Sequence, residues 1–175
     1  EPPPFERIIV GFDVAVTAKE RSDYNAWSGW GIRGRHAYFL DAGRKKTEGG
    51  DAERHIGMFA ETMRRMYRKP VVIVSAKVKE DRLVGQILRQ RAHFPVVPVT
   101  MRDLLTTANM IAPYMEAGQV VWPETMPEWF LDEMKVYDRG QHDDGVASAL
   151  AALSYVFLHG MPARRKRAIS LWDAA

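Results

Sequence analysis

The chain contains no cysteine among its 175 residues, and this absence excludes several classes of site. Disulfide bonds, thiolate zinc sites and cysteine nucleophiles are impossible. No apolar run approaches the ~18 residues that span a bilayer, and no signal-peptide pattern opens the sequence. The five histidines are scattered, without a His-Glu-x-x-His zinc motif, and no Gly-x-Ser-x-Gly turn is present. We therefore expect an intracellular protein with no membrane partner.

The length and the ends of the chain predict one folded unit with two appendages. A length of 175 residues is enough for a single domain with its own hydrophobic core. The sequence begins Glu-Pro-Pro-Pro, which we interpret as the remnant of a Pro-rich linker from a longer protein. We expect a linker remnant at 1–6, a domain at 7–159 and a basic tail at 160–175.

Basic residues are clustered although the net charge is only +3. One cluster is 44–46, another lies within 64–69, and a third is 164–167. Such clusters suit a polyanionic substrate such as nucleic acid. The alternatives that involve no substrate are that 64–69 forms the solvent-exposed face of a helix and that the basic tail aids solubility.

Hydrophobic periodicity predicts a mixed α/β fold. Aromatic and β-branched runs at 7–13, 24–32 and 36–41 indicate an antiparallel meander, with a tight turn at 33–35. Helix-spaced and β-branched segments then alternate at 51–69, 71–74, 79–91 and 95–99. This order implies a mixed sheet with crossover helices on its faces. Further helices are expected at 103–117, 126–137 and 143–158, and a short edge strand at 119–122.

Acidic residues stand at two places that the fold could bring together. Asp13 ends a buried strand and, by alternation, shares a face with Gly11, which leaves room for another element to approach the sheet. Asp143 and Asp144 open a helix of small residues that can pack close to that sheet. Taken separately, Asp13 can be interpreted as the first residue of a turn, and Asp143 and Asp144 as residues that cap a helix N-terminus. Three convergent carboxylates would instead suit a divalent cation, as in a metal-dependent nuclease.

Several stretches match a known family in order and spacing. They are Arg-Ile-Ile-Val-Gly-Phe-Asp-Val-Ala at 7–15, Ser-Asp-Tyr at 22–24, Tyr-Phe-Leu-Asp at 38–41 and Gln-His-Asp-Asp-Gly-Val at 141–146, with 71–83 and 118–123 between them. Together they resemble the nuclease domain of large terminase subunits of viruses such as tailed bacteriophages, over residues 7–158. The resemblance implies an RNase H-like fold that cuts concatemeric viral DNA during genome packaging.

The resemblance also implies cofactors, partners and a location. Two divalent ions, Mg²⁺ or Mn²⁺, would assist cleavage of double-stranded DNA. In the full protein the resemblance implies an ATPase domain. No Gly-x-x-x-x-Gly-Lys-Ser/Thr loop occurs in this chain, so we expect that domain to lie N-terminal to it. The implied further partners are the small terminase subunit and the portal protein, in the host cell cytoplasm.

The resemblance assigns the catalytic and metal-binding roles to Asp13, Asp143 and Asp144. The family usually has Glu or Asp at the end of its fourth strand, where this chain has Ser75, so we expect one ion to bind weakly or through water. Auxiliary roles fall to Ser75, Asp23 and His142. DNA contacts are expected from basic residues: Arg44, Lys45, Lys46, Lys77, Arg164, Arg165, Lys166 and Arg167.

Two other functions stay open at this point. Because Ser75 replaces an acid, the domain could hold DNA while cutting it weakly or not at all. Alternatively, the same fold could serve a Holliday-junction resolvase or a transposase-type nuclease, since fold alone does not decide chemistry. Binding without nicking in Mn²⁺ would favour the first alternative, and a preference for branched DNA would favour the second.

Overall fold

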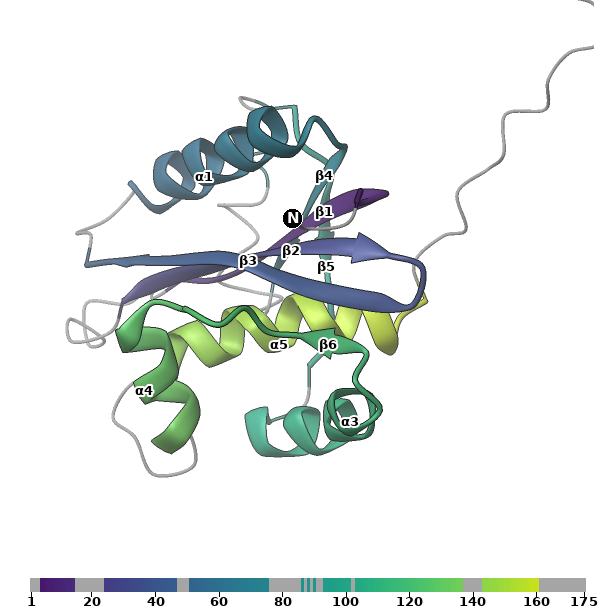
Figure 1. Ribbon diagram of the computed structural model, residues 1–175. Helices are drawn as coiled ribbons and strands as arrows, with labels where there is room; N and C mark the ends of the chain where they lie inside the picture. The colour runs from purple at the N-terminus through teal and green to yellow at the C-terminus, as the bar shows by residue number, and fades with distance from the viewer. Residues whose placement is uncertain are drawn as a thin grey trace, which may run out of the picture.

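A computed structural model describes residues 4–14, 24–46, 51–75, 86, 88, 90, 93–101, 103–136 and 143–160. These residues form a six-stranded sheet between helices (Figure 1). The strands are β1 (Arg7–Asp13), β2 (Asn25–Arg33), β3 (His36–Lys45), β4 (Val71–Ser75), β5 (Val96–Pro98) and β6 (Val120–Val121). The helices with defined bounds are α1 (Ala52–Tyr67), α3 (Leu104–Glu116), α4 (Glu128–Val136) and α5 (Asp144–Phe157).

The sheet has the order β5-β4-β1-β2-β3-β6. β1, β2 and β3 form the expected antiparallel meander, whereas β4 runs parallel to β1, β5 parallel to β4, and β6 parallel to β3. Helix α1 covers one face, and α5 lies against the other, with α3 and α4 on the same side (Figure 1). The predicted RNase H-like mixed sheet flanked by helices is confirmed.

Most elements differ from their predicted bounds by one or two residues at an end, and the differences at β3 and α1 have a clear structural cause. β3 continues past Asp41 to Lys45, because β2 pairs with it along its full length as far as the pair Asn25 and Lys45. Helix α1 ends at Tyr67, where Arg68 takes a left-handed conformation with φ 51°. The chain therefore leaves the helix before Pro70 could end it.

The predicted helix at 79–91 lies mostly outside the described residues. Within it, Gln86, Leu88 and Gln90 are helical, and Leu88 is buried. Across the described residues no helix has the length and apolar character needed to cross a membrane.

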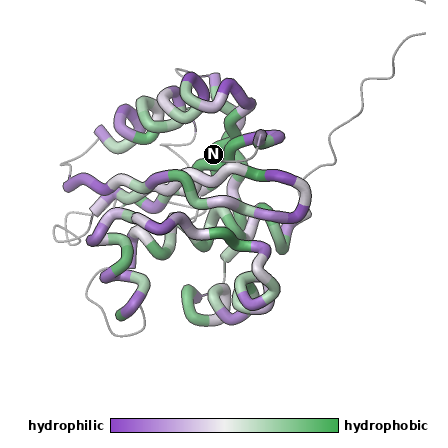
Figure 2. The backbone as a smooth tube through the Cα atoms, viewed as in Figure 1, coloured by the Kyte–Doolittle hydropathy of each residue, from purple (hydrophilic) through white to green (hydrophobic). Residues whose placement is uncertain are grey.

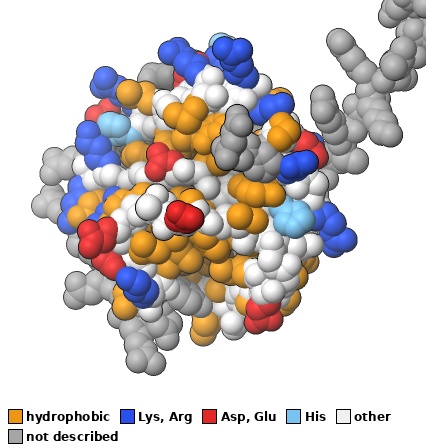
Figure 3. All heavy atoms as spheres, in the orientation of Figure 1, with side chains coloured by type: hydrophobic (Ala, Val, Ile, Leu, Met, Phe, Trp, Pro, Cys, Tyr) orange, Lys and Arg blue, Asp and Glu red, His pale blue; other side chains and the backbone are white. Residues whose placement is uncertain are grey.

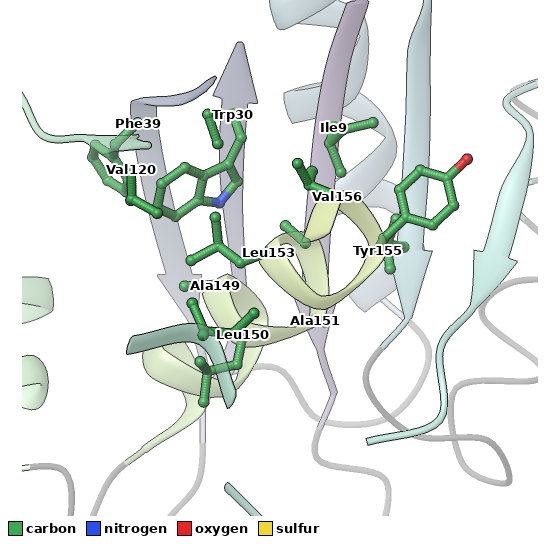
Figure 4. Close-up of a cluster of buried hydrophobic side chains, with 14 of the residues drawn as sticks. Ile9, Trp30, Phe39, Val120, Ala149, Leu150, Ala151, Leu153, Tyr155 and Val156 are labelled. Atoms are coloured by element: carbon green, nitrogen blue, oxygen red, sulfur yellow. The ribbon is translucent and has the colours of Figure 1, made fainter. Parts of the chain in front are cut away.

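Alternation along β1 divides the core into two layers. Ile8, Val10 and Phe12 pack towards α1, while Ile9 packs with α5 on the opposite face. The second layer includes Trp30 and aliphatic side chains of α5, drawn in Figure 4. Figure 2 shows that hydrophilic and hydrophobic residues alternate along α1, as expected for a helix with one face on the sheet. The α5 layer is the one that positions the candidate site.

Candidate functional site

Asp13 is the last residue of β1 and lies on the α5 face of the sheet. It shares this face with Ile9 and Gly11, and its exposed fraction is 3%. A Cβ atom at Gly11 would collide with the carbonyl oxygen of Ser148 in α5. Glycine is required here because the backbones of β1 and α5 are in direct contact. The room predicted beside Asp13 is therefore filled by the last helix.

Asp144 begins α5 and lies at the same end of the β1–α5 contact. Its side chain is 7% exposed, and its Oδ2 accepts a hydrogen bond from the Tyr24 N–H at 3.2 Å. Tyr24 directly precedes β2, in which Ala26 pairs with Asp13. The structure therefore places two buried carboxylates from opposite ends of the sequence at the same end of the sheet.

Asp143 occupies the N-cap position of α5, but its side chain makes no capping hydrogen bond. The acceptor at this helix start is a different residue, because the Gly145 N–H donates to Oε2 of Glu133 at 2.8 Å. The simple interpretation of Asp143 as an N-cap therefore does not describe its side chain. Asp143 is partly buried beside Asp144.

Glu133 of α4 is a residue that sequence reasoning missed. It is 5% exposed, and its Oε1 is 2.7 Å from Nη1 of Arg44. A signal for it exists in the sequence, because Glu133 interrupts the apolar stripe formed by Trp129, Phe130 and Met134 at helical spacing. A carboxylate in such a stripe is expensive to bury without a cationic partner.

Arg44 is held by residues of the protein itself. Its guanidinium carbon lies 4.4 Å from the centre of the Tyr24 ring and 4.6 Å from that of Trp129, in addition to the contact with Glu133. Lys45 and Lys46 are exposed, and Nζ of Lys46 is 4.8 Å from the Tyr24 ring centre. A DNA contact of Arg44, Lys45 or Lys46 stays a prediction.

The basic residues of α1 lie across the sheet from the two buried acids. Arg64 and Arg65 both donate to Glu61 of the same helix, and their hydrogen bonds lower the pKa of Glu61 to about 2. On the face seen in Figure 3, Lys and Arg side chains lie mostly around the periphery, and hydrophobic side chains fill much of the middle.

Ser75 is buried but lies on the other face of the sheet. Its backbone pairs with Phe12, and alternation along β4 places it with Val71 and Ile73, which pack towards α1. The structure therefore does not bring Ser75 to the α5 face, where Asp13 lies. The remaining predicted site residues lie outside the described residues: Asp23, His142, Lys77, Arg164, Arg165, Lys166 and Arg167.

Buried hydroxyl groups of β2 and α5 form hydrogen bonds near the start of α5. Trp30 Nε1 donates to Oγ of Ser28 at 3.0 Å, and the hydroxyl oxygens of Ser28 and Ser148 are 3.2 Å apart. Ser148 also donates to the Gly145 carbonyl at 2.7 Å. This chain of hydrogen bonds joins β2 to the first turn of α5.

The donor set at this end of the sheet suits a hard divalent cation. Asp13 and Asp144 would offer carboxylate oxygens, with Asp143 beside them, and Mg²⁺ and Mn²⁺ prefer such ligands. Within the described ranges no group of three or more His, Asp or Glu side chains is already arranged to hold a metal ion. The chemistry of these side chains therefore fits a divalent cation, and the buried carboxylates of Asp13 and Asp144 would be its first two ligands.

Comparison with known proteins identifies the fold. No family model and no curated protein matches the sequence. Among solved structures, the Mn-soaked terminase nuclease domain of human cytomegalovirus matches with a TM-score of 0.66 and 9% identity, over 87% of this chain and 84% of that one. The zinc-bound large terminase nuclease of the thermophilic phage G20c matches with a TM-score of 0.61 and 20% identity, over 87% of this chain and 82% of that one.

A longer protein also contains this fold. The large terminase of the thermophilic bacteriophage D6E, solved in complex with ADP, matches with a TM-score of 0.61 and 14% identity. The match covers 90% of this chain and 41% of the phage protein. The chain therefore has the RNase H-like fold of the nuclease domains of viral large terminases.

Proposed function

We propose that this chain is a metal-dependent endonuclease domain that cuts concatemeric viral DNA during genome packaging. The observation that carries the proposal is the position of two buried acids, Asp13 and Asp144, at the same end of the β1–α5 contact, in a fold shared with terminase nuclease domains. Burying two carboxylates at the same end of the sheet is costly unless a positive charge compensates them. A divalent cation would compensate that charge, and a polyanionic substrate would bring its phosphate to the cation.

Each acid has a defined part in this proposal. Asp13, Asp144 and Asp143 would hold Mg²⁺ or Mn²⁺, with two ions in total and one of them weakly bound. When bound, such ions lower the pKa of a water and stabilise the leaving oxygen of the phosphodiester. Lys45 and Lys46 are exposed at the end of β3 and would hold the DNA backbone without reading its bases.

The proposed partners follow from the same family. The matched part of the D6E large terminase is less than half of that protein, which supports the proposal that this chain is one domain of a longer terminase subunit. We expect an N-terminal ATPase domain, a small terminase subunit and a portal protein, acting on double-stranded DNA in the host cell cytoplasm.

Substitution of the two buried acids tests the proposal. We expect the wild-type chain to nick plasmid DNA in Mn²⁺ or Mg²⁺ and to stop when EDTA is added. Asp13→Asn and Asp144→Asn should each lower the nicking rate by at least ~100-fold, because loss of a ligand exceeds the usual cost of losing a supporting residue.

The matched control is Asp41→Asn, because Asp41 is an exposed strand aspartate opposite Gly29, which faces Phe59 of α1. Asp41→Asn should cut at the wild-type rate. Undiminished cutting by Asp13→Asn or Asp144→Asn would contradict the assigned roles.

A second function is favoured by the position of Ser75. Since Ser75 lies on the α1 face, and no group of three or more acidic or histidine side chains within the described residues is already arranged to hold a metal ion, the isolated domain could hold DNA without cutting it. Mn²⁺ titration with plasmid DNA separates the two functions. Retarded but intact plasmid at saturating Mn²⁺ would support the DNA-holding module.

A further inference from the structure

Glu133 is a buried carboxylate with both oxygens engaged. Oε1 accepts from Nη1 of Arg44 at 2.7 Å, and Oε2 accepts from the Gly145 N–H at 2.8 Å. One side chain of α4 thus links the edge of the sheet to the first turn of α5. Both contacts involve an ionised group and are of the stronger kind of hydrogen bond.

The contact with Gly145 satisfies the start of α5 from outside the helix. The first N–H groups of a helix have no partner within it, and an N-cap side chain usually accepts from one of them. Asp143 holds the N-cap position without making that bond. Because Glu133 accepts from Gly145 instead, the carboxylate of Asp143 is not committed to capping.

Arg44 connects this arrangement to Asp13. Asp13 pairs with Ala26 on β2, and Ala26 pairs with Arg44 on β3, so the three residues form one row across the sheet. Two strand spacings separate the ends of this row, or about 10 Å. The positive charge of Arg44 therefore lies in the same region as the acids at the start of α5 and offsets the repulsion that Glu133 would add.

Gly145 is the residue that allows Glu133 to approach. A Cβ atom at this position would lie 2.7 Å from Oε2 of Glu133 and 2.7 Å from Cζ3 of Trp129. Both contacts are too short for a real Cβ, so any larger residue must displace the carboxylate or the ring. Glycine here has a steric role independent of helix propensity.

We propose that Glu133 is a positioning residue for the acids at the start of α5. Held by Arg44, it fixes the first turn of α5 and leaves the carboxylate of Asp143 available to the cation site. This inference rests on the proposed function, because the role of the site is to bind divalent cations. Residues that orient metal ligands without touching the metal typically contribute 10–100-fold to metal affinity, and we expect about this size of effect.

Calorimetric titration with Mn²⁺ alone tests the inference. Glu133→Ala should weaken Mn²⁺ binding by ~10–100-fold. Glu133→Gln keeps an amide oxygen that can accept from Gly145, and it should recover most of the affinity. Glu128→Ala is the matched control, because it removes an exposed glutamate from the same helix and should bind Mn²⁺ as the wild type does.

Gly145→Ala provides a variant that keeps every charge. Its added methyl group should displace Oε2 of Glu133 and reduce Mn²⁺ affinity in the same direction as Glu133→Ala. If Glu133→Ala fails to fold, the comparison of Gly145→Ala with Glu133→Gln still decides the question. Wild-type Mn²⁺ affinity in both Glu133→Ala and Gly145→Ala, or in Gly145→Ala alone when Glu133→Ala does not fold, would overturn the inference.

Amide exchange of Gly145 separates this inference from the proposed function. The Gly145 N–H should exchange with solvent at least ~10-fold faster in Glu133→Ala than in Glu128→Ala, because a charge-assisted hydrogen bond is lost. If the wild type binds Mn²⁺ but does not cut DNA, the proposed function fails and the positioning role stands. If Gly145 exchanges equally in both variants, the positioning role fails even when the wild type cuts DNA.

Discussion

Ser28 and Ser148, whose hydroxyl groups lie near the first turn of α5, differ in which hydrogen bonds require them. Ser28 is fully buried and is the acceptor for the indole N–H of Trp30, which is also fully buried. Ser148 donates to the Gly145 carbonyl within its own helix. Removing Ser28 leaves the fixed indole N–H of Trp30 without an acceptor, whereas removing Ser148 affects the hydroxyl of Ser28, which can rotate.

Ser28→Ala is therefore expected to lower the free energy of unfolding by ~1–3 kcal/mol, the cost of a buried polar group without a partner. Ser148→Ala should cost less, because alanine is also the better helix former. Urea unfolding of the two variants measures the difference. An equal loss of stability in both would contradict the assignment of Ser28 as the essential acceptor.

Single residues also mark the limit of prediction from sequence. Asp13 and Asp144 were predictable because a strand end and a helix start carry local patterns, and alternation gave the face of Asp13. The interruption of the apolar stripe of α4 marks Glu133, but its partners Arg44 and Gly145, 89 and 12 positions away, are given by no local pattern. The face of Ser75 depends on the parallel register of β4 with β1, which no local pattern provides.

The contact between β1 and α5 decides how closely the two acid-bearing elements approach. Gly11 on the strand and Ala152 on the helix leave no space between the backbones, and a Cβ atom at Gly11 would also lie 3.0 Å from the Cβ of Ala152. The contact is formed by backbone atoms, which cannot rotate away. Any side chain at position 11 must therefore move the whole helix.

Gly11→Ala is expected to destabilise the fold by ~1–3 kcal/mol or more, the usual cost of overpacking a core. Gly57→Ala in α1 is the matched control, because its Cβ would make only an ordinary contact of 3.4 Å with Leu88. Alanine favours a helix interior by ~0.5–1 kcal/mol over glycine, so this variant should be as stable as the wild type or more so. Denaturant midpoints at constant slope give the comparison. A stable Gly11→Ala protein would show that α5 can shift.

Element types followed from the sequence more reliably than element ends. The apolar stripe predicted α1, but its end at Tyr67 depends on the left-handed conformation of Arg68 rather than on Pro70. β3 runs beyond Asp41 because Asn25, Ala26 and Trp27 of β2 provide partners for its last residues. Pairing with a distant strand can lengthen a strand past the point where its own hydrophobic pattern fades.

At the scale of the whole molecule, the position of its positive charges relative to the acids determines how DNA could lie on it. Lys46 is exposed near Tyr24, on the side of the buried acids, whereas Arg64 lies on α1 across the sheet. Arg64 is also paired with Glu61, which reduces its free charge. DNA bound for cleavage should therefore depend on Lys46 and not on Arg64.

The salt dependence of DNA affinity tests this orientation. If Lys46 contacts one phosphate, Lys46→Ala should reduce the slope of log affinity against log salt concentration by ~0.9. Arg64→Ala should leave the slope unchanged. Fluorescence anisotropy with a labelled duplex in Ca²⁺, across a series of salt concentrations, gives both slopes. A reduced slope for Arg64→Ala alone would place the DNA along α1.

The hydrogen bond between Tyr24 and Asp144 joins residues 120 positions apart. During synthesis on the ribosome, β1 and the meander emerge long before α5, so Asp13 waits without its partner acid until almost the entire domain has been made. Any chain that terminates prematurely before α5 lacks Asp144 altogether. If these two acids form the proposed cation site, the site can be assembled only after translation has reached α5, and a truncated product cannot contain it.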